Sequence, residues 1–199
     1  MENKHLGSVF DNESDLIKAL IKIHNENKDI ELDATYFKGN FYKNGINSPK
    51  LKFDINPQFD NVVKGNAENL PLNNNSINCM MIDLPFMFGN RKSQQKYYSS
   101  NTHGIYQSFD DLYISYENVL KESYRILKKK GILFFKCQDY TDNHTTITHC
   151  IVYLLATKMG FYAKDLAILH LPKNKIANNK LTQKHLRKHH SYFWVFIKT

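Results

Sequence analysis

The sequence has no hydrophobic run long enough to span a lipid bilayer, which takes about 20 consecutive apolar residues. The first residues, Met1 to His5, also lack the regions of a secretory signal peptide. These two absences argue against both a membrane protein and a secreted protein. We therefore expect a chain that acts in the cytoplasm and has no membrane partner.

Cysteine is scarce, with three residues at positions 79, 137 and 150 and no Cys-x-x-Cys pair. Such spacing is typical of buried thiols in a reducing compartment rather than of disulfides or zinc ligands. The adjacent histidines His189 and His190 have no carboxylate or cysteine at ligand spacing. The sequence therefore predicts no metal site.

Acidic residues are fewer than basic ones, with 19 aspartates and glutamates against 27 lysines and arginines. The resulting net charge of +8 and pI near 9.2 favour a polyanionic partner such as nucleic acid. A length of 199 residues fits one domain with a sizeable core, and 42% hydrophobic residues is a globular value. We expect a single domain over residues 1–199.

The most informative stretch is an apolar run over residues 79–82 that leads into the tetrapeptide Asp83-Leu84-Pro85-Phe86. A short apolar run that ends in a carboxylate and a turn former is typical of a buried parallel strand with the acid at its carboxyl tip. Ligands of open α/β sheets bind at this edge. The sequence therefore predicts a functional site around Asp83.

The tetrapeptide resembles the Asp-Pro-Pro-Tyr/Phe motif of S-adenosylmethionine-dependent amino methyltransferases, which modify adenine or cytosine in DNA. The exocyclic amine of a base is a poor nucleophile, because its lone pair is delocalised into the ring. The resemblance implies that Asp83 and the Leu84 carbonyl accept the two amine hydrogens, that Pro85 fixes the backbone, and that Phe86 stacks on a flipped base. Leu84 stands where the motif has its first proline.

Two further segments resemble cofactor motifs of the same family. One is Asp33-Ala34-Thr35-Tyr36, which follows a strand predicted over residues 29–33 and has Gly39 three residues later; the other is Gly65-Asn66-Ala67. The resemblance implies S-adenosylmethionine as the cofactor. Gly39 would let the backbone approach its methionine part, and Asn66, where the family has an aspartate, would contact its adenine.

A strand predicted over residues 50–57 carries Asp54, about twenty residues after Asp33. In Rossmann folds, an acid at the end of the second strand accepts hydrogen bonds from a ribose. The candidates for cofactor binding are therefore Asp33, Thr35, Tyr36, Gly39, Asp54, Gly65, Asn66 and Ala67.

Periodicity predicts helices over residues 11–27, 110–130 and 145–159, and strands over 161–171 and 191–198. Lys128 to Lys130 would close the second helix before Gly131. The segment Tyr124–Asp139 resembles the one that leads into the family's fifth strand, so Lys136, Gln138 and Asp139 are expected at a strand tip. The resemblance implies the class I methyltransferase fold, a Rossmann-like α/β sheet of seven strands, the last antiparallel, flanked by helices.

Two segments, about residues 87–109 and 172–190, lack apolar periodicity and carry basic and aromatic side chains. We expect them to contact DNA, because the chain leaves no room for a separate target-recognition domain. A small phage-like member of the family would have this organisation. The candidates for nucleic-acid binding are Arg91, Lys92, Lys96, Lys184, Arg187 and Lys188.

The resemblance implies transfer of a methyl group to an exocyclic amine of a base in DNA, with adenine N6 favoured over cytosine N4. No cysteine follows a proline, as the nucleophile of carbon-5 cytosine enzymes does, so no covalent intermediate is expected. Two alternatives stay open. One is a methyltransferase acting on RNA or a protein amide. The other, motivated by Leu84, Asn66 and the sparse glycines, is a catalytically degenerate relative that binds cofactor or DNA.

Overall fold

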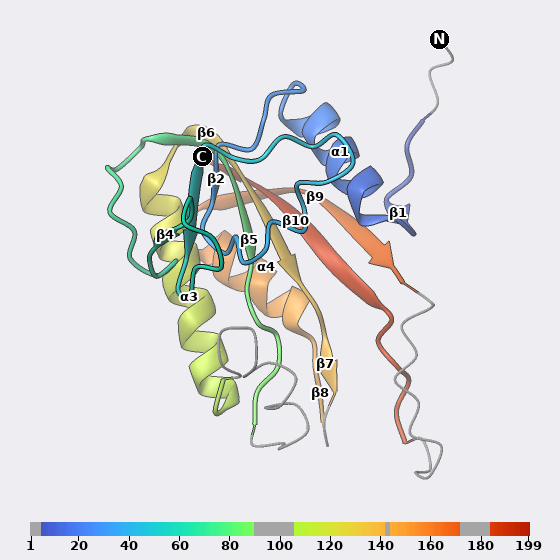
Figure 1. Ribbon diagram of the computed structural model, residues 1–199. Helices are drawn as coiled ribbons and strands as arrows, with labels where there is room; N and C mark the ends of the chain where they lie inside the picture. Colours follow the sequence, from blue (N-terminus) through green and yellow to red (C-terminus); the bar gives the residue numbers. More distant parts are fainter. Residues whose placement is uncertain (1–4, 90–105, 142–143, 172–183) are drawn as a thin grey trace.

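The computed structural model describes residues 5–89, 106–141, 144–171 and 184–199. Eight strands form one sheet in the order β1-β9-β10-β6-β5-β2-β3-β4 (Figure 1). They are β1 Val9–Phe10, β2 Leu32–Asp33, β3 Leu51–Asp54, β4 Val63–Lys64, β5 Ile77–Asp83, β6 Leu127–Cys137, β9 Phe161–His170 and β10 His190–Lys198. β10 is antiparallel to both of its neighbours. The predicted α/β sheet with an antiparallel last strand is confirmed, but it has eight strands rather than seven, because β1 pairs with β9.

The apolar run of the sequence analysis forms β5, which lies between β2 and β6. Residues 79–82 are almost completely buried. The register pairs Met81 with Asp33 of β2, and Asp83 with Lys136 of β6. Because these strands are parallel, their carboxyl ends meet at one edge of the sheet.

Helices cover both faces of the sheet (Figure 1). α1, Glu13–His24, packs on one face, and α3, Phe109–Ile126, and α4, Thr148–Lys158, pack on the other. Side chains alternate along β5, so Met81 belongs to the cluster beneath α1 and Met80 to the cluster beneath α3 and α4. The carboxyl edge of β5 is therefore supported by packed apolar clusters on both faces of the sheet.

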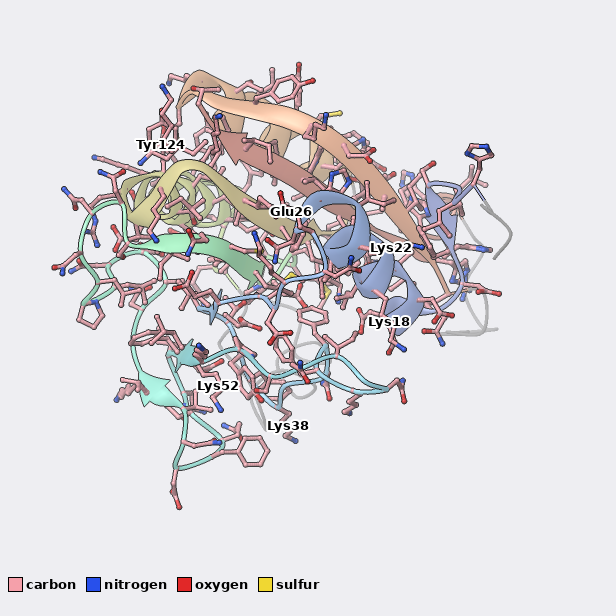
Figure 2. The ribbon with its side chains drawn as sticks, turned by 90° about the horizontal axis from the view of Figure 1, so that it is seen from above. Lys18, Lys22, Glu26, Lys38, Lys52 and Tyr124 are labelled. Carbon is pink, nitrogen blue, oxygen red and sulfur yellow. The ribbon has the colours of Figure 1, made fainter. Side chains whose placement is uncertain are left out.

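α1 is the helix predicted over residues 11–27, with shorter bounds. It begins after Asn12, whose side chain accepts a hydrogen bond from the Asp15 backbone N–H at 3.1 Å. Its exposed residues include Lys18 and Lys22, which Figure 2 labels on α1, and the apolar Ile23. Among the helices that the structure describes, none is long and apolar enough to cross a membrane.

The helix predicted over residues 110–130 ends earlier than expected. α3 begins with a capping box between Ser108 and Asp111 and stops at Ile126, and the three lysines belong to β6. Leu127 is completely buried and already extended, and β5 pairs with it and then directly with Ile132. The three exposed lysines therefore form an outward bulge of the strand, because the chain must bury the residues on either side of them.

The other predicted elements are present with adjusted bounds, and besides β1 three further short strands were not predicted. The helix predicted over 145–159 is α4, and the strands predicted over 29–33, 50–57, 161–171 and 191–198 are β2, β3, β9 and β10. The sequence analysis did not anticipate β4 or the hairpin of β7, Tyr140–Thr141, and β8, Thr145–Thr146. The hairpin follows directly on the tip of β6.

Candidate active site

The tetrapeptide Asp83–Phe86 lines a pocket of about 240 Å³ at the carboxyl edge of the sheet. The other walls are formed by Thr35, Phe37, Lys136, Cys137, Gln138 and Ser191. The side chain of Asp83 is 31% exposed, so its carboxylate is open to a ligand in the pocket. The structure therefore brings the four predicted catalytic residues together in one concave site.

Three contacts fix the backbone of the tetrapeptide. The Asp83 backbone N–H donates a hydrogen bond to the Thr35 hydroxyl at 2.8 Å. Tyr116 of α3 donates its hydroxyl hydrogen to the Pro85 carbonyl at 3.0 Å. Leu84 is buried in the core between the sheet and α3. Burial thus anchors the position at which the family motif has its first proline.

The Asp83 carboxylate is paired with a lysine. Lys136 Nζ lies 3.1 Å from Asp83 Oδ2 and 3.0 Å from Oε1 of Glu13, the first residue of α1. Burial raises the pKa of Asp83, and the Lys136 ammonium and its hydrogen bond oppose that rise. The ion pair therefore favours the ionised carboxylate, which is the stronger hydrogen-bond acceptor for an amine.

Of the other residues predicted at the tip of β6, Gln138 lines the pocket and accepts a hydrogen bond from the Ser191 hydroxyl at 3.2 Å. Asp139 does not line it. That carboxylate is buried and lies 2.8 Å from His149 Nδ1. The strand tip thus contributes Lys136 and Gln138 to the site, while Asp139 ties the tip to α4.

A second pocket, of about 260 Å³, adjoins the first. Both pockets are lined by Thr35, Leu84 and Pro85. The remaining walls of the second pocket are Ala34, Ile55, Asn66, Ala67, Glu68, Tyr106, Ser115 and Val119. Ile55 is 48% exposed, so an apolar side chain is available here beside the polar Asn66 and Glu68. Such a mixture suits a ligand that combines a flat ring with hydroxyl groups.

Glu68 is a pocket residue that the sequence analysis did not single out. Its carboxylate oxygens accept hydrogen bonds from the Ser115 hydroxyl at 2.6 Å and from the Asn118 amide at 3.1 Å, both on α3. Glu68 lies two residues after Asn66, directly after the Gly65-Asn66-Ala67 segment that resembles a cofactor motif. Only the approach of α3 shows that this carboxylate is held in place.

Three predicted cofactor residues make the same local turn. Asp33, Asp54 and Asn66 each accept a hydrogen bond on the side-chain oxygen from the backbone N–H two residues later, at 2.8, 2.8 and 3.0 Å. Asp33 and Asp54 are completely buried and line neither pocket, whereas Asn66 is exposed and lines the second. The two aspartates therefore shape the loops at the strand tips.

The two buried aspartates also fix the loop after β2. Asp33 accepts further hydrogen bonds from the Thr35 hydroxyl at 3.2 Å and the Tyr42 hydroxyl at 2.8 Å, and Asp54 accepts one from the Phe37 backbone N–H at 2.7 Å. Burial raises the pKa of Asp33 to about 7, although the hydrogen bonds from Thr35 and Tyr42 oppose the rise. The loop that carries Thr35 into both pockets thus depends on these carboxylates.

Gly39 and Gly65 are required by neighbouring rings. Gly39 has a φ of +64°, and a Cβ there would lie 2.5 Å from the Tyr36 hydroxyl oxygen. A Cβ on Gly65 would lie 2.8 Å from the Phe53 ring. Tyr36 in turn stacks on Tyr42, with ring centroids 5.5 Å apart. The predicted cofactor residues Tyr36, Gly39 and Gly65 therefore pack the loops behind the pockets and do not line them.

We expect Gly39→Ala to destabilise the fold by about 1–3 kcal/mol, because the left-handed backbone and the clash with Tyr36 both disfavour a Cβ. Urea denaturation measures the change. Gly45→Ala is the matched control, because Gly45 also has a positive φ, of +86°, but a Cβ there meets nothing within 4 Å. An equal loss of stability in both variants would show that ring packing contributes nothing.

The predicted nucleic-acid residues are described only in part. Arg91, Lys92 and Lys96 lie outside the described residues. Lys184 and Arg187 are exposed, and the half-buried Lys188 lies against the first pocket, with its carbonyl 3.5 Å from the Gln138 amide nitrogen.

In the described part of the chain, no group of three or more histidines, cysteines or carboxylates could hold a metal ion.

Residues 77–199 match the family model for N6/N4 methyltransferases, described as DNA methylase. This segment includes the tetrapeptide and the residues of β6 and β10 that line the first pocket. The chain belongs to this DNA methylase family. Among curated proteins, none matches the sequence. The family match leaves out α1 and the first half of the sheet, so the roles of those elements must be argued from their geometry.

Solved structures show the fold of this chain. A SAM-dependent methyltransferase from Archaeoglobus fulgidus is 15% identical, with 93% of this chain and 94% of that chain covered and a TM-score of 0.51. A SAM-dependent methyltransferase from Thermotoga maritima is 17% identical, with 94% and 88% covered and a TM-score of 0.50. The predicted class I methyltransferase fold is confirmed.

A candidate DNA modification methylase from Thermus thermophilus is also similar, at 15% identity and a TM-score of 0.44. The match covers 67% of this chain and 52% of the other. The chain thus spans about half the length of that protein.

Proposed function

We propose that this protein transfers a methyl group from S-adenosylmethionine to the exocyclic amino nitrogen of a base in DNA, with adenine N6 as the first choice. The observation that carries the proposal is the placement of Asp83 to Phe86 between two adjoining pockets. One pocket has a carboxyl group paired with Lys136 and an aromatic side chain, and the other mixes apolar and polar walls. A base and a cofactor would meet at the shared wall.

In the first pocket, the chain supplies hydrogen-bond acceptors and a stacking surface. Asp83 accepts one hydrogen of the amine and the Leu84 carbonyl accepts the other, which draws the nitrogen toward tetrahedral geometry and frees its lone pair. Phe86 offers a face to the base. Because Thr35 and Tyr116 hold the tetrapeptide backbone, the acceptors are positioned before the substrate binds.

In the second pocket, Ile55, Asn66, Ala67 and Glu68 would hold the nucleoside part of the cofactor, and Thr35 stands at the boundary with the first pocket. The bound cofactor supplies an electrophilic methyl group. Asp33 and Asp54 act indirectly in this proposal, since they fix the loops that carry Thr35 and Ile55. Lys184 and Arg187 would contact phosphates beside the first pocket.

The direct test is transfer of labelled methyl from S-adenosylmethionine to unmethylated DNA, with RNA and a protein mixture in parallel. Label in DNA supports the proposal, and nucleoside digestion then distinguishes N6-methyladenine from N4-methylcytosine. Label in RNA or protein alone would establish the first alternative function. Cofactor binding by calorimetry without transfer to any polymer would establish the degenerate relative.

We expect Ile55→Asp to weaken S-adenosylmethionine binding at least about tenfold, because the variant replaces an apolar wall of the second pocket with a charge. Calorimetry measures the dissociation constant. Phe59→Asp is the matched control, because Phe59 is similarly exposed, at 51%, but lines neither pocket. Unchanged affinity in Ile55→Asp would place the cofactor elsewhere.

A further inference from the structure

Glu13 and Lys136 form a charged group with Asp83 that joins three separate parts of the chain. Glu13 opens α1, Lys136 is the last residue but one of β6, and Asp83 ends β5. The Lys136 ammonium lies 3.0 Å from Glu13 Oε1 and 3.1 Å from Asp83 Oδ2. The ammonium also lies over the rings of Phe41 and Phe193, with its nitrogen 4.9 and 5.7 Å from their centroids. These contacts hold it in one place.

The lysine remains a cation in this setting. Burial would lower its pKa, but the neighbouring carboxylates of Asp83 and Glu13 outweigh burial and hold the pKa above its usual range. The triad therefore places one cation between two carboxyl groups. With its cation at the centre, it keeps two carboxylates close together beside the pocket.

The two partners act on Asp83 in opposite directions. The Lys136 ammonium lowers the pKa of Asp83, and the Glu13 carboxylate raises it. Other ionisable groups within electrostatic reach of Asp83 are Asp33 of β2, Tyr116 of α3 and Cys137 of β6. Burial raises the pKa of each of these three groups, so Tyr116 and Cys137 stay neutral near pH 7, while Asp33, with a pKa of about 7, is partly ionised there.

We propose that Lys136 is a positioning residue that keeps Asp83 a carboxylate and fixes its orientation, and that Glu13 tunes this effect by sharing the ammonium. Because Lys136 occupies Oδ2, Oδ1 is left to face an incoming amine. α1 thereby becomes part of the active site, although it lies outside the segment that matches the family model. The inference rests on the proposed function for its effect on turnover, but not for its effect on Asp83.

The test compares the pH dependence of kcat in four variants. Lys136→Met should lower kcat at pH 7 by at least about tenfold and move the acidic side of the profile upward by about one pH unit, because Asp83 then holds its proton longer. Lys136→Arg should restore most of the activity. Glu13→Gln should move the same side of the profile downward. Asp15→Asn, an exposed acid on the same helical turn, should change nothing.

A purely structural role predicts a different pattern. It would lower kcat equally at every pH, with no movement of the profile, in both Lys136→Met and Glu13→Gln. That result would overturn the inference. Thermal melts followed by circular dichroism show whether each variant is folded. If Lys136→Met does not fold, the pH profiles of Lys136→Arg and Glu13→Gln are compared with that of the wild type.

A second measurement is independent of turnover. Carbon-13 labelling of aspartate carboxyl groups, with Asp83→Asn to assign the resonance, gives the titration midpoint of Asp83 by NMR. The midpoint should rise in Lys136→Met and fall in Glu13→Gln. If wild-type protein methylates no polymer, the proposed function fails, while these midpoints still decide whether Lys136 and Glu13 control Asp83. Unchanged midpoints would reject the inference whether or not methyl transfer occurs.

Discussion

Asp83→Asn should lower kcat for methyl transfer by about 10³-fold while leaving the affinity for S-adenosylmethionine within about twofold. The substitution keeps the size of the side chain but removes the charge that accepts the amine hydrogen. The pocket for the cofactor nucleoside is unaffected, because Asp83 does not line it. Lys136 keeps its ion pair with Glu13, so the strand tip remains folded.

Labelled-methyl transfer and calorimetry on the same preparation separate the two effects. Asp60→Asn is the control, because Asp60 is an exposed acid that lines neither pocket. Retained turnover together with lost cofactor binding in Asp83→Asn would invert the proposed roles of the two pockets.

The free energy of unfolding should fall by as much as about 4 kcal/mol as the pH rises from about 4 to about 7, and Asp33 should account for the fall. Burial raises the pKa of Asp33 to about 7 in the folded protein. Below pH 4 this carboxyl is protonated in both the folded and the unfolded chain. Between pH 4 and pH 7 the unfolded chain ionises while the folded protein holds its proton, so ionisation progressively favours unfolding.

Urea denaturation at several pH values measures the slope. In Asp33→Asn the corresponding part of the slope should disappear, so the stability difference between wild type and variant should shrink as the pH rises. Asp60→Asn controls for the loss of an exposed carboxylate and should follow the wild type. A parallel pair of curves for wild type and Asp33→Asn would mean that the buried carboxyl has an ordinary pKa.

The sequence predicts the tip of β5 well because that signal is local. An apolar run, one carboxylate and a proline specify a buried strand that must stop, and topology then places its end at the binding edge. The pairing of Asp83 with Lys136 follows from strand register. The contact with Glu13 does not, because it depends on how α1 lies across the sheet, 123 residues away from Lys136 in the chain.

Asp33, Asp54 and Asn66 show that a motif does not separate direct binding from a role in shaping a loop. In each case, a side-chain oxygen that could face a ligand instead accepts the N–H two residues later. Asp and Asn are known for this turn, so the turn was available from sequence as an alternative to direct binding. Asp33 and Asp54 are completely buried, whereas Asn66 is exposed and lines the second pocket, and this difference depends on the fold as a whole.

The three lysines before Gly131 illustrate a second limit. A basic run followed by glycine is typical of a helix end, and the prediction for residues 110–130 follows that rule. The competing requirement is that Leu127 pairs with β5 in the core. A local pattern cannot reveal this requirement, since it arises only when β5 and β6 pair.

The place of β10 in the sheet has a consequence for how the protein is made. β10 separates β6 from β9, so neither strand can complete its backbone hydrogen bonds on that side before β10 emerges from the ribosome. Strands β2, β3, β5 and β6 can assemble during synthesis, but the nascent chain still exposes one unpaired side of β6. Chaperone binding to stalled nascent chains should therefore be strongest after β9 is synthesised and should fall once β10 is released.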